Sequence, residues 1–301
     1  MDDGAILIVG VGGIGCLWSQ KAHSRCSELA DLLFIDSDES SFSNSNEAHC
    51  LHLDAEGEGN GFAALPNLAA HRLAAGMGAI SDIIDESELV IILAALGGGT
   101  GSGAAAEIAR RAKESGSLVI SLIGLPFAEQ PLRCAIAEKT LPSIEINSNL
   151  CIRLSLERLA WQARYRDSDW KTGSEWIGEL IEGLVTTLAR VGKMNLDLMD
   201  LRNIINIHGD STLIVGTGTT SDPMSVVEMA KESPLSDIEI KGAKGCMIQV
   251  EGGPDMTLSH LNSVSEAFVS LLDNDCQVIL GARSSDEMTG NLRLVAVVSG
   301  I

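Results

Sequence analysis

Residues 96–103 read LGGGTGSG, directly after the apolar run ELVIILAA. Five glycines in the seven positions 97–103 are costly, because glycine loses more backbone freedom on folding than any other residue. A strand that breaks into bare backbone and then enters a helix presents its N–H groups at the positive end of the helix dipole. Phosphate is the usual occupant of such an anion site. The segment therefore predicts a phosphate loop between a strand and a helix.

A second glycine segment, GVGGIG (10–15), follows the apolar run AILIV near the start of the chain. Asp36 and Asp38 come about twenty residues later, which completes the fingerprint of a dinucleotide-binding Rossmann unit. On its own this short pattern is a weak signal, and its glycines could serve only a tight strand–helix turn. Together, two phosphate loops on neighbouring strands favour one long polyphosphate, such as a nucleoside triphosphate.

Apolar segments alternate with amphipathic segments through the first half of the chain, which predicts a doubly wound α/β domain with a parallel sheet covered on both faces. A long apolar stripe of helical period then predicts a central helix over 174–192, which Gly192 would end. A smaller α/β region follows. The expected strands are 5–10, 32–38, 89–96 and 117–127, and the expected helices 16–25 and 103–116. The expected divisions are a nucleotide-binding domain (1–173), the central helix (174–193) and a C-terminal domain (194–301).

Charge, cysteine spacing and the length of the apolar runs together limit where the protein acts and what it binds. With 41 acidic and 21 basic residues the formal net charge is −20, which argues against nucleic-acid binding. Seven cysteines without C-x-x-C spacing indicate reduced thiols. The acidic start MDDGAILIVG is no signal peptide, and no apolar run reaches the ~18 residues of a membrane span. We therefore expect a soluble, cytoplasmic protein without direct membrane insertion.

The segment AHCLHLD carries one group of candidate metal ligands, His49, Cys50, His52 and Asp54. Because the chain has no second ligand pair at zinc-finger spacing, a polar loop is the better interpretation.

Several segments together resemble the tubulin/FtsZ superfamily of GTPases. GGGTGSGAA is similar to the superfamily signature G-G-G-T-G-[ST]-G, and ILIVGVGGIG looks like its opening strand and first phosphate loop. LPFAEQPLRCAIAE is similar to the segment P-F-x-x-E-G-x-x-R and keeps Glu129 and Arg133. MNLDLMDLRNI resembles the N-x-D-x-x-D loop after the central helix, and LRLVAVVSGI looks like the end of the FtsZ second domain. The resemblance spans essentially the whole chain and is closer to bacterial FtsZ than to tubulin.

The resemblance implies a GTPase that binds GTP or GDP with Mg²⁺ and polymerises head to tail into cytoskeletal filaments of cell division. It also allows another FtsZ-family protein as a partner. The acidic loop would insert into the nucleotide site of the next subunit, with Asn195, Asp197 and Asp200 as catalytic residues. The nucleotide-binding residues that it implies are Gly12, Gly13, Ile14, Gly15, Asp38, Gly97, Gly98, Gly99, Thr100, Gly101, Ser102, Gly103, Glu129, Arg133, Trp170 and Ser174. Among them, Trp170 would stack on the base and Ser174 would face the guanine edge.

Some positions depart from the family pattern. Ile14 interrupts the first glycine run, and Leu154-Ser155-Leu156 replaces a Pro-Asn-Asp segment beside the ribose. The chain ends at Ile301, so we expect assembly through the folded domains alone.

Three alternatives stay open from the residues. Asp197 and Asp200 could serve only as helix caps. The chain could be an NAD(P)-dependent or nucleotide-activating Rossmann enzyme, or a weakly hydrolysing nucleotide-dependent scaffold of the same fold. If the phosphate-loop prediction is right, a side chain added at Gly98 or Gly99 should collide with the ligand.

Overall fold

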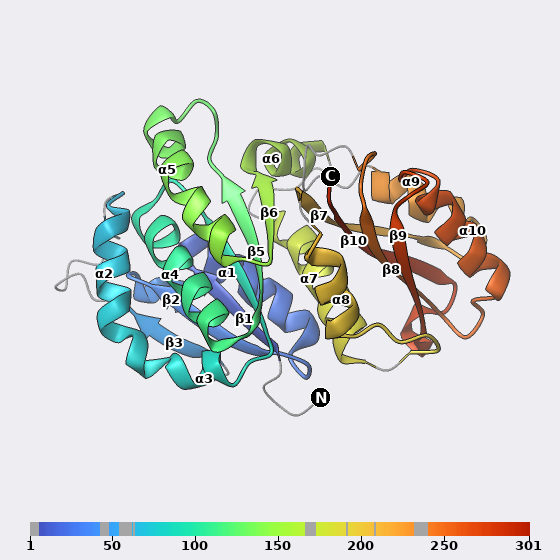
Figure 1. The fold of residues 1–301 in the computed structure, drawn as a ribbon, viewed down its shortest axis with the longest axis horizontal. Helices are drawn as coiled ribbons and strands as arrows, with labels where there is room; N and C mark the ends of the chain where they lie inside the picture. Colours follow the sequence, from blue (N-terminus) through green and yellow to red (C-terminus); the bar gives the residue numbers. More distant parts are fainter. Residues whose placement is uncertain are drawn as a thin grey trace. The chain divides into compact units, whose positions relative to one another are not determined.

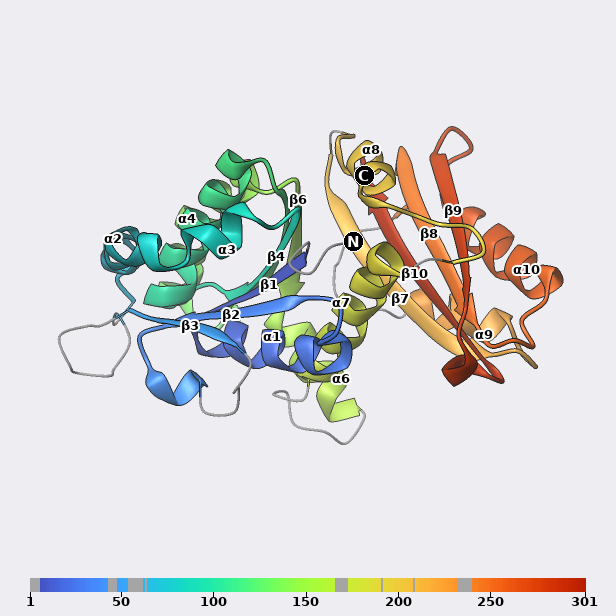
Figure 2. The same cartoon turned by 90° about the horizontal axis from the view of Figure 1, so that it is seen from below.

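The computed structural model describes residues 6–42, 48–53, 62, 64–165, 173–190, 192–207, 209–231 and 240–301. They belong to two compact units, Met1–Gly178 and Glu179–Ile301. Each unit has its own β-sheet, and Figures 1 and 2 together label the elements of both. Within the described residues, no helix has the length and apolar character needed to cross a membrane.

The first unit is built on a six-stranded sheet in the order β3-β2-β1-β4-β5-β6, with all neighbours parallel. Its central strands are runs of Val, Ile and Leu because both of their faces are covered; every residue of β1 is buried. The strand order changes direction between β1 and β4, and ligands of doubly wound sheets bind at the carboxyl ends of the strands at such a switch point. The strands are β1 (Ile6–Val11), β2 (Asp31–Asp36), β3 (His49–His52), β4 (Leu89–Ala95), β5 (Leu118–Leu125) and β6 (Leu150–Ser155).

Helices cover both faces of this sheet. In Figure 2, α1 lies on one face and α2, α3 and α4 lie on the other. The doubly wound architecture is therefore confirmed, but α1 begins at Gly12 and α4 at Gly99 instead of at 16 and 103. Part of each glycine segment is thus the first turn of a helix. The helices are α1 (Gly12–Cys26), α2 (Pro66–Gly76), α3 (Ser81–Asp85), α4 (Gly99–Ser115), α5 (Pro131–Asn147) and α6 (Leu156–Tyr165).

The segment that we expected to be a polar loop forms the edge strand β3, so that expectation was wrong. His49, Cys50 and His52 pair in parallel with β2, and Asp54 lies outside the described residues. Within the part of the chain that the structure describes, no group of three or more His, Cys, Asp or Glu side chains could hold a metal ion.

The central helix α7 (Ser174–Ala189) begins in the first unit and ends in the second, at Ala189 rather than at Gly192. The second unit holds a four-stranded sheet in the order β7-β10-β8-β9, in which only the β8–β9 pair is parallel. Figure 2 shows α9 and α10 on one face of this sheet and α8 on the other. The remaining elements are α8 (Leu198–Ile205), β7 (Ser211–Thr219), α9 (Met224–Lys231), β8 (Gly245–Gly252), α10 (Leu258–Val269), β9 (Gln277–Ser284) and β10 (Asn291–Ser299).

Candidate nucleotide site

The two glycine segments lie side by side at the carboxyl ends of β1 and β4. These strands are neighbours, with Val11 paired to Ala94 at their ends. Gly12 has a φ of +74°, and a Cβ placed on it would lie 3.3 Å from the backbone N of Gly101. The sequence therefore brings both predicted phosphate loops to the switch point of the sheet, as one long polyphosphate would require.

The helices that start there have free N-terminal ends. Val11 is the N-cap of α1 and Gly98 is the N-cap of α4, and neither helix has a side-chain cap hydrogen bond or an acidic residue in its first turn. The first N–H groups of an α-helix have no partner within the helix. Two uncapped helix ends next to each other form a strong site for an anion such as phosphate.

Most of the glycines in the two segments are required by close packing. A Cβ on Gly15 would overlap the carbonyl oxygen of Leu93, and one on Gly101 would overlap that of Ala95. The same test on Gly103 meets the carbonyl oxygen of Pro66. These glycines let the two helices approach the backbone of β4 and α2.

Gly98 and Gly99 differ sharply, although we expected a side chain at either to meet the ligand. A Cβ on Gly99 would lie 2.6 Å from the Cβ of Phe62, so Gly99 is needed for packing within the protein. A Cβ on Gly98 has no protein atom within 4 Å, and the φ of Gly98 is −100°. Gly13 is similarly open, with only side-chain atoms at 3.7 and 3.8 Å. Gly98 is therefore the position that tests ligand contact without disturbing the fold.

The two side chains of the signature segment are buried and hydrogen-bonded. The Ser102 hydroxyl accepts a hydrogen bond from the backbone N–H of Gly97 at 2.9 Å, which closes the loop on itself. The Thr100 hydroxyl lies 3.4 Å from that of Ser37, which follows β2. Thr100 therefore links the signature loop, which follows β4, to the end of β2, which lies on the far side of β1 in the sheet.

Asp36, at the end of β2, is the acid beside the first glycine segment. Its Oδ2 accepts a hydrogen bond from Ser41 at 2.6 Å and lies 3.8 Å from a Cβ placed on Gly13. Asp38, which the resemblance implied as a ligand-binding residue, is exposed and accepts hydrogen bonds from Ser40 that hold its carboxyl pKa below the usual value. Of the two acids, Asp36 is thus the one placed next to the phosphate-loop backbone.

The segment before α5 also reaches the signature loop. A Cβ on Gly97, whose φ is +95°, would lie 2.7 Å from the Cβ of Arg133. Arg133 is exposed in the first turn of α5, and Glu129 is exposed just before that helix. Among the described residues, no ion pair joins Glu129 to Arg133, so the two side chains do not neutralise each other. The structure thus brings the backbone and Cβ of Arg133 beside the signature loop.

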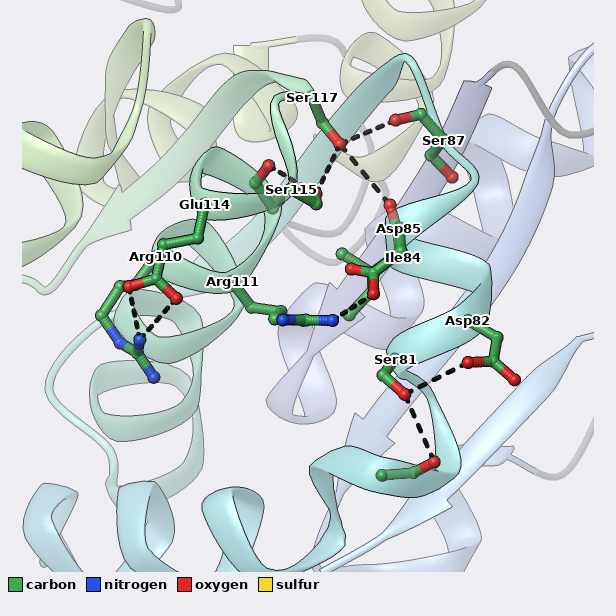
Figure 3. A network of polar contacts seen from close by, with 12 residues as sticks. Ser81, Asp82, Ile84, Asp85, Ser87, Arg110, Arg111, Glu114, Ser115 and Ser117 are labelled. Atoms are coloured by element: carbon green, nitrogen blue, oxygen red, sulfur yellow. Dashed lines mark hydrogen bonds and ion pairs between the residues drawn. The ribbon is translucent and has the colours of Figure 1, made fainter.

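The opposite end of α4 is held firmly, which fixes its free N-terminus. Arg111 forms an ion pair with Asp85 of α3, and the Ser117 hydroxyl donates to the carbonyl oxygen of Ser87 at 2.7 Å (Figure 3). The Ser115 and Ser117 hydroxyls are 3.1 Å apart. These contacts join α4 to the starts of β4 and β5, far from the glycine loops.

The positions expected near the base and sugar are described only in part. Ser174 is 7% exposed as the first residue of α7, and Trp170 lies outside the described residues. The Ser155 hydroxyl, at the end of β6, accepts a hydrogen bond from the backbone N–H of Arg158 at 3.2 Å. Ser155 therefore serves the start of α6.

In the second unit, Asp197 and Asp200 form the N-terminal cap of α8. The Asp197 carboxylate accepts hydrogen bonds from the backbone N–H groups of Met199 and Asp200 at 2.8 and 2.9 Å, and the Asp200 carboxylate accepts one from that of Asp197 at 3.1 Å. Asn195 is exposed, and its Oδ1 accepts a hydrogen bond from the backbone N–H of Gly192. Capping is thus a real role of both acids. Each still has one carboxylate oxygen without a hydrogen-bond partner among the described residues.

Comparison with known proteins identifies the family. The family model "Tubulin/FtsZ family, GTPase domain" matches residues 5–162, and the model "FtsZ family, C-terminal domain" matches residues 209–301. The chain belongs to the Tubulin/FtsZ family. The chain therefore carries a GTPase domain that binds GTP or GDP, and the dinucleotide-enzyme alternative receives no support.

Relatives and solved structures agree over nearly the whole chain of this FtsZ-family GTPase. Cell division protein FtsZ 2 of Haloferax volcanii is 29% identical, with 99% of this chain and 76% of that protein covered. Cell division protein FtsZ 1 of Archaeoglobus fulgidus is also 29% identical, with 98% and 82% covered. An FtsZ dimer structure from M. jannaschii has a TM-score of 0.85 at 25% identity and covers 98% of this chain and 88% of that one. These relatives are archaeal.

The reasoning from sequence missed two residues near the site, Phe62 and Ser37, and it carried Asp38 rather than Asp36 as the nucleotide-binding acid. Phe62 explains Gly99, and Asp36 and Ser37 lie beside the glycine loops. The signal for Asp36 and Ser37 was available, because Asp36 ends the strand next to β1 and Ser37 follows it, so both lie at the same edge of the sheet. Nothing in the sequence marks Phe62, which lies between residues 54–61 and 63 that the structure does not describe.

Proposed function

We propose that this FtsZ-family GTPase assembles head to tail and hydrolyses GTP where two subunits meet, as a protein of cell division. The observation that carries the proposal is the pair of uncapped helix ends of α1 and α4 at one switch point, in a unit whose glycine loops include no evident general base. The acids that would serve belong to the second unit and lie more than ninety residues later in the chain. A site divided in this way is completed by a neighbouring molecule.

In this proposal the backbone N–H groups of 12–15 and 97–103 bind the phosphates. Arg133 adds a positive charge beside Gly97, and Glu129 and Ser174 belong to the sugar and base side. Mg²⁺ takes most of its ligands from phosphate and water. The residues present fit that ion, because the Asp36 carboxylate and the Thr100 hydroxyl lie beside the phosphate loops and a cation would offset the carboxylate charge. When bound, Mg²⁺ would neutralise charge on the phosphates.

For the chemical step we infer that Asp197 and Asp200 of one subunit orient and polarise the water that attacks the terminal phosphate of GTP held by the next. Asn195 would contribute its amide group to the same contact. A phosphoryl transfer of this kind needs positioning more than covalent chemistry. The capping hydrogen bonds support this role because they hold both carboxylates in one orientation.

The expected partner is a second copy of the chain. The titles of the similar structures support this, since one is an FtsZ dimer and another is a GTPγS-bound protofilament of CetZ2 from Haloferax volcanii. A head-to-tail contact uses two different surfaces and therefore propagates as a filament. Another FtsZ-family protein is a further candidate, because Halobacterium salinarum has both an FtsZ 1 and an FtsZ 2. We place the protein in the cytoplasm.

One observation favours a second candidate, a weakly hydrolysing scaffold of the same fold. Each acid already uses one carboxylate oxygen to accept the hydrogen bonds that cap α8. If that is their whole role, the chain binds GTP and assembles but turns over slowly.

Phosphate release measured against protein concentration, with sedimentation of the same samples, tests the proposal. We expect a rate per molecule near zero in dilute protein and a steep rise once polymer forms. Polymer without a rise in the rate would select the scaffold. A constant rate per molecule with no polymer at any concentration would refute assembly-dependent hydrolysis.

A further inference from the structure

The acidic loop between α7 and α8 lies along strand β9. Met194 and Ala282 exchange both backbone hydrogen bonds, each at 3.0 Å, in an isolated antiparallel bridge. On one side of this bridge, a Cβ placed on Gly192 would lie 2.7 Å from the carbonyl oxygen of Ala282. On the other side, a Cβ on Gly281 would lie 2.6 Å from Cγ of Leu196. The loop is therefore seated on residues 281–283, and we call these three residues the β9 platform.

A buried chain of ion pairs holds the platform in place. Arg283 pairs with Glu251 of β8, Glu251 pairs with Arg293 of β10, and Arg293 pairs with Glu182 of α7 at 2.9 Å. The two strand contacts follow the sheet register, in which Glu251 is opposite both arginines. Arg283, Glu251 and Arg293 are 6%, 4% and 8% exposed. Removing one member of such a buried pair leaves an uncompensated charge, so the register of β9 is strongly fixed.

The arginine at the centre of this chain stays charged. Burial lowers the pKa of Arg293, but the carboxylates of Glu251 and Glu182 more than offset this, and its pKa lies above the usual value. Arg293 therefore carries its positive charge between the two glutamates that tie the sheet to α7.

The helix that follows the acids is fixed to the same sheet. The Ser299 hydroxyl of β10 donates to the carbonyl oxygen of Ile204, near the end of α8, at 2.6 Å, and Ser299 is fully buried. The loop is thus held at three places, through Glu182 before it, Met194 within it and Ile204 after it. All three contacts lead to the sheet of the second unit.

We propose that the β9 platform is a positioning element for hydrolysis, which fixes Asp197 and Asp200 in the orientation that the neighbouring subunit's nucleotide requires. This inference rests on the proposed function, because it assumes that these acids act on that nucleotide. It assigns a role in turnover to backbone groups of Met194 and Ala282 that hydrogen-bond to each other.

The decisive comparison is M194P against M194A. Both variants lack the thioether side chain, which is 40% exposed, but only proline also lacks the N–H that donates to Ala282. Three quantities are measured for each: GTP affinity by calorimetry, polymer mass by sedimentation, and phosphate release per polymerised subunit at saturating GTP. Both glycine loops belong to the other unit, so binding should not depend on this hydrogen bond.

We expect M194P to match M194A in GTP affinity and polymer mass, and to release phosphate about tenfold to a hundredfold more slowly, the scale of a small misplacement of a reacting group. Equal phosphate release by the two variants would overturn the inference. So would a loss of polymer confined to M194P, because the bridge would then serve assembly and not orientation.

Gly281→Ala provides a second route to the platform if M194P does not fold. The added methyl would press on Leu196 and on the Gln249 amide, while the bridge hydrogen bonds remain. The same split between unchanged affinity and slower turnover is expected, and normal turnover in a folded G281A would overturn the inference. Variants of Asp197 and Asp200 distinguish a failure of the proposed function from a failure of the platform's role. If D197N and D200N leave turnover unchanged, the proposed function fails; if they abolish it while M194P and G281A do not slow it, only the platform fails.

Discussion

Gly98→Val is the substitution that most directly tests the phosphate site. The Cβ of a side chain at this position meets no protein atom within 4 Å, and the backbone there has φ −100° and ψ 175°, which valine adopts readily. Gly98 is the N-cap of α4, so the side chain would stand at the free N-terminal end of that helix. If phosphate binds there, valine excludes it.

The magnitudes follow from the contacts that are gained and lost. Hydrogen bonds to a charged group contribute about 1.5–3 kcal/mol each, so losing two of those from the first turn of α4 costs at least about 3 kcal/mol, or about a hundredfold in Kd. Valine is a poorer N-cap than glycine, which lowers the free energy of unfolding by about 1 kcal/mol. Valine also restricts the unfolded chain, which raises the free energy of unfolding by about 0.4–1 kcal/mol. The net change in stability should therefore be small, within about 4 °C in Tm.

The assay is titration calorimetry with GTP on protein whose Tm has been measured first, and Gly99→Ala is the matched control. Its methyl would lie 2.6 Å from the Cβ of Phe62 and 3.1 Å from the Phe62 backbone, so overpacking should destabilise the first unit by about 1–3 kcal/mol. The pair thus separates a ligand clash, with the Tm retained, from a packing clash, with the Tm lowered. A folded G98V that binds GTP as the parent does would mean that the signature loop is only structural, and the phosphate site would have to be abandoned.

Further predictions concern the acids and the start of α7. Asn caps helices as well as Asp does, so D197N and D200N should keep the parent's Tm and GTP affinity while phosphate release falls by about a hundredfold or more. D197A should also lose about 1 kcal/mol of unfolding free energy, because it removes the cap. If D197N keeps the parental turnover, Asp197 is a helix cap alone. Hydrogen bonds and ion pairs with Lys21 and Arg25 depress the pKa of Glu175. Because that folded-state pKa lies below the unfolded value, the pairs contribute at neutral pH and their stabilisation is lost as the pH falls through the depressed pKa. E175Q should therefore reduce the unfolding free energy near pH 7 by less than about 1 kcal/mol and make no difference in strong acid, and an equal deficit at both pH values in chemical denaturation would contradict this account.

How far the sequence predicts this molecule depends on how local each signal is. The alternation of apolar strands with helices, and the positions of β1 and β4, follow from residues that are adjacent in the chain. The starts of α1 and α4 do not, because glycine has a low helix propensity and pattern reasoning placed these segments in loops. In the structure the packing of Gly15 on β4 and of Gly103 on Pro66 outweighs that propensity.

Long-range contacts account for what was missed. His49 and His52 look like loop residues until β2 provides a parallel partner for them. Gly99 looks equivalent to Gly98 until Phe62 is placed against it, since the two differ only in what surrounds them. Arg133 is placed beside Gly97 by the packing of α5, which no local pattern in LPFAEQPLR reveals.

The capping box of α8 bears directly on whether its acids are catalytic or structural, because the two roles do not compete. Asp197 uses Oδ1 for the backbone N–H groups of Met199 and Asp200, and Asp200 uses Oδ2 for that of Asp197. The capping hydrogen bonds hold both carboxylates in fixed positions at the N-terminal end of the helix, where negative charge is favourable. A group that must orient a water molecule gains from being held before the reaction begins, because no reorganisation is then needed. The uncommitted oxygens, Asp197 Oδ2 and Asp200 Oδ1, are consequently the atoms that we expect to face the attacking water.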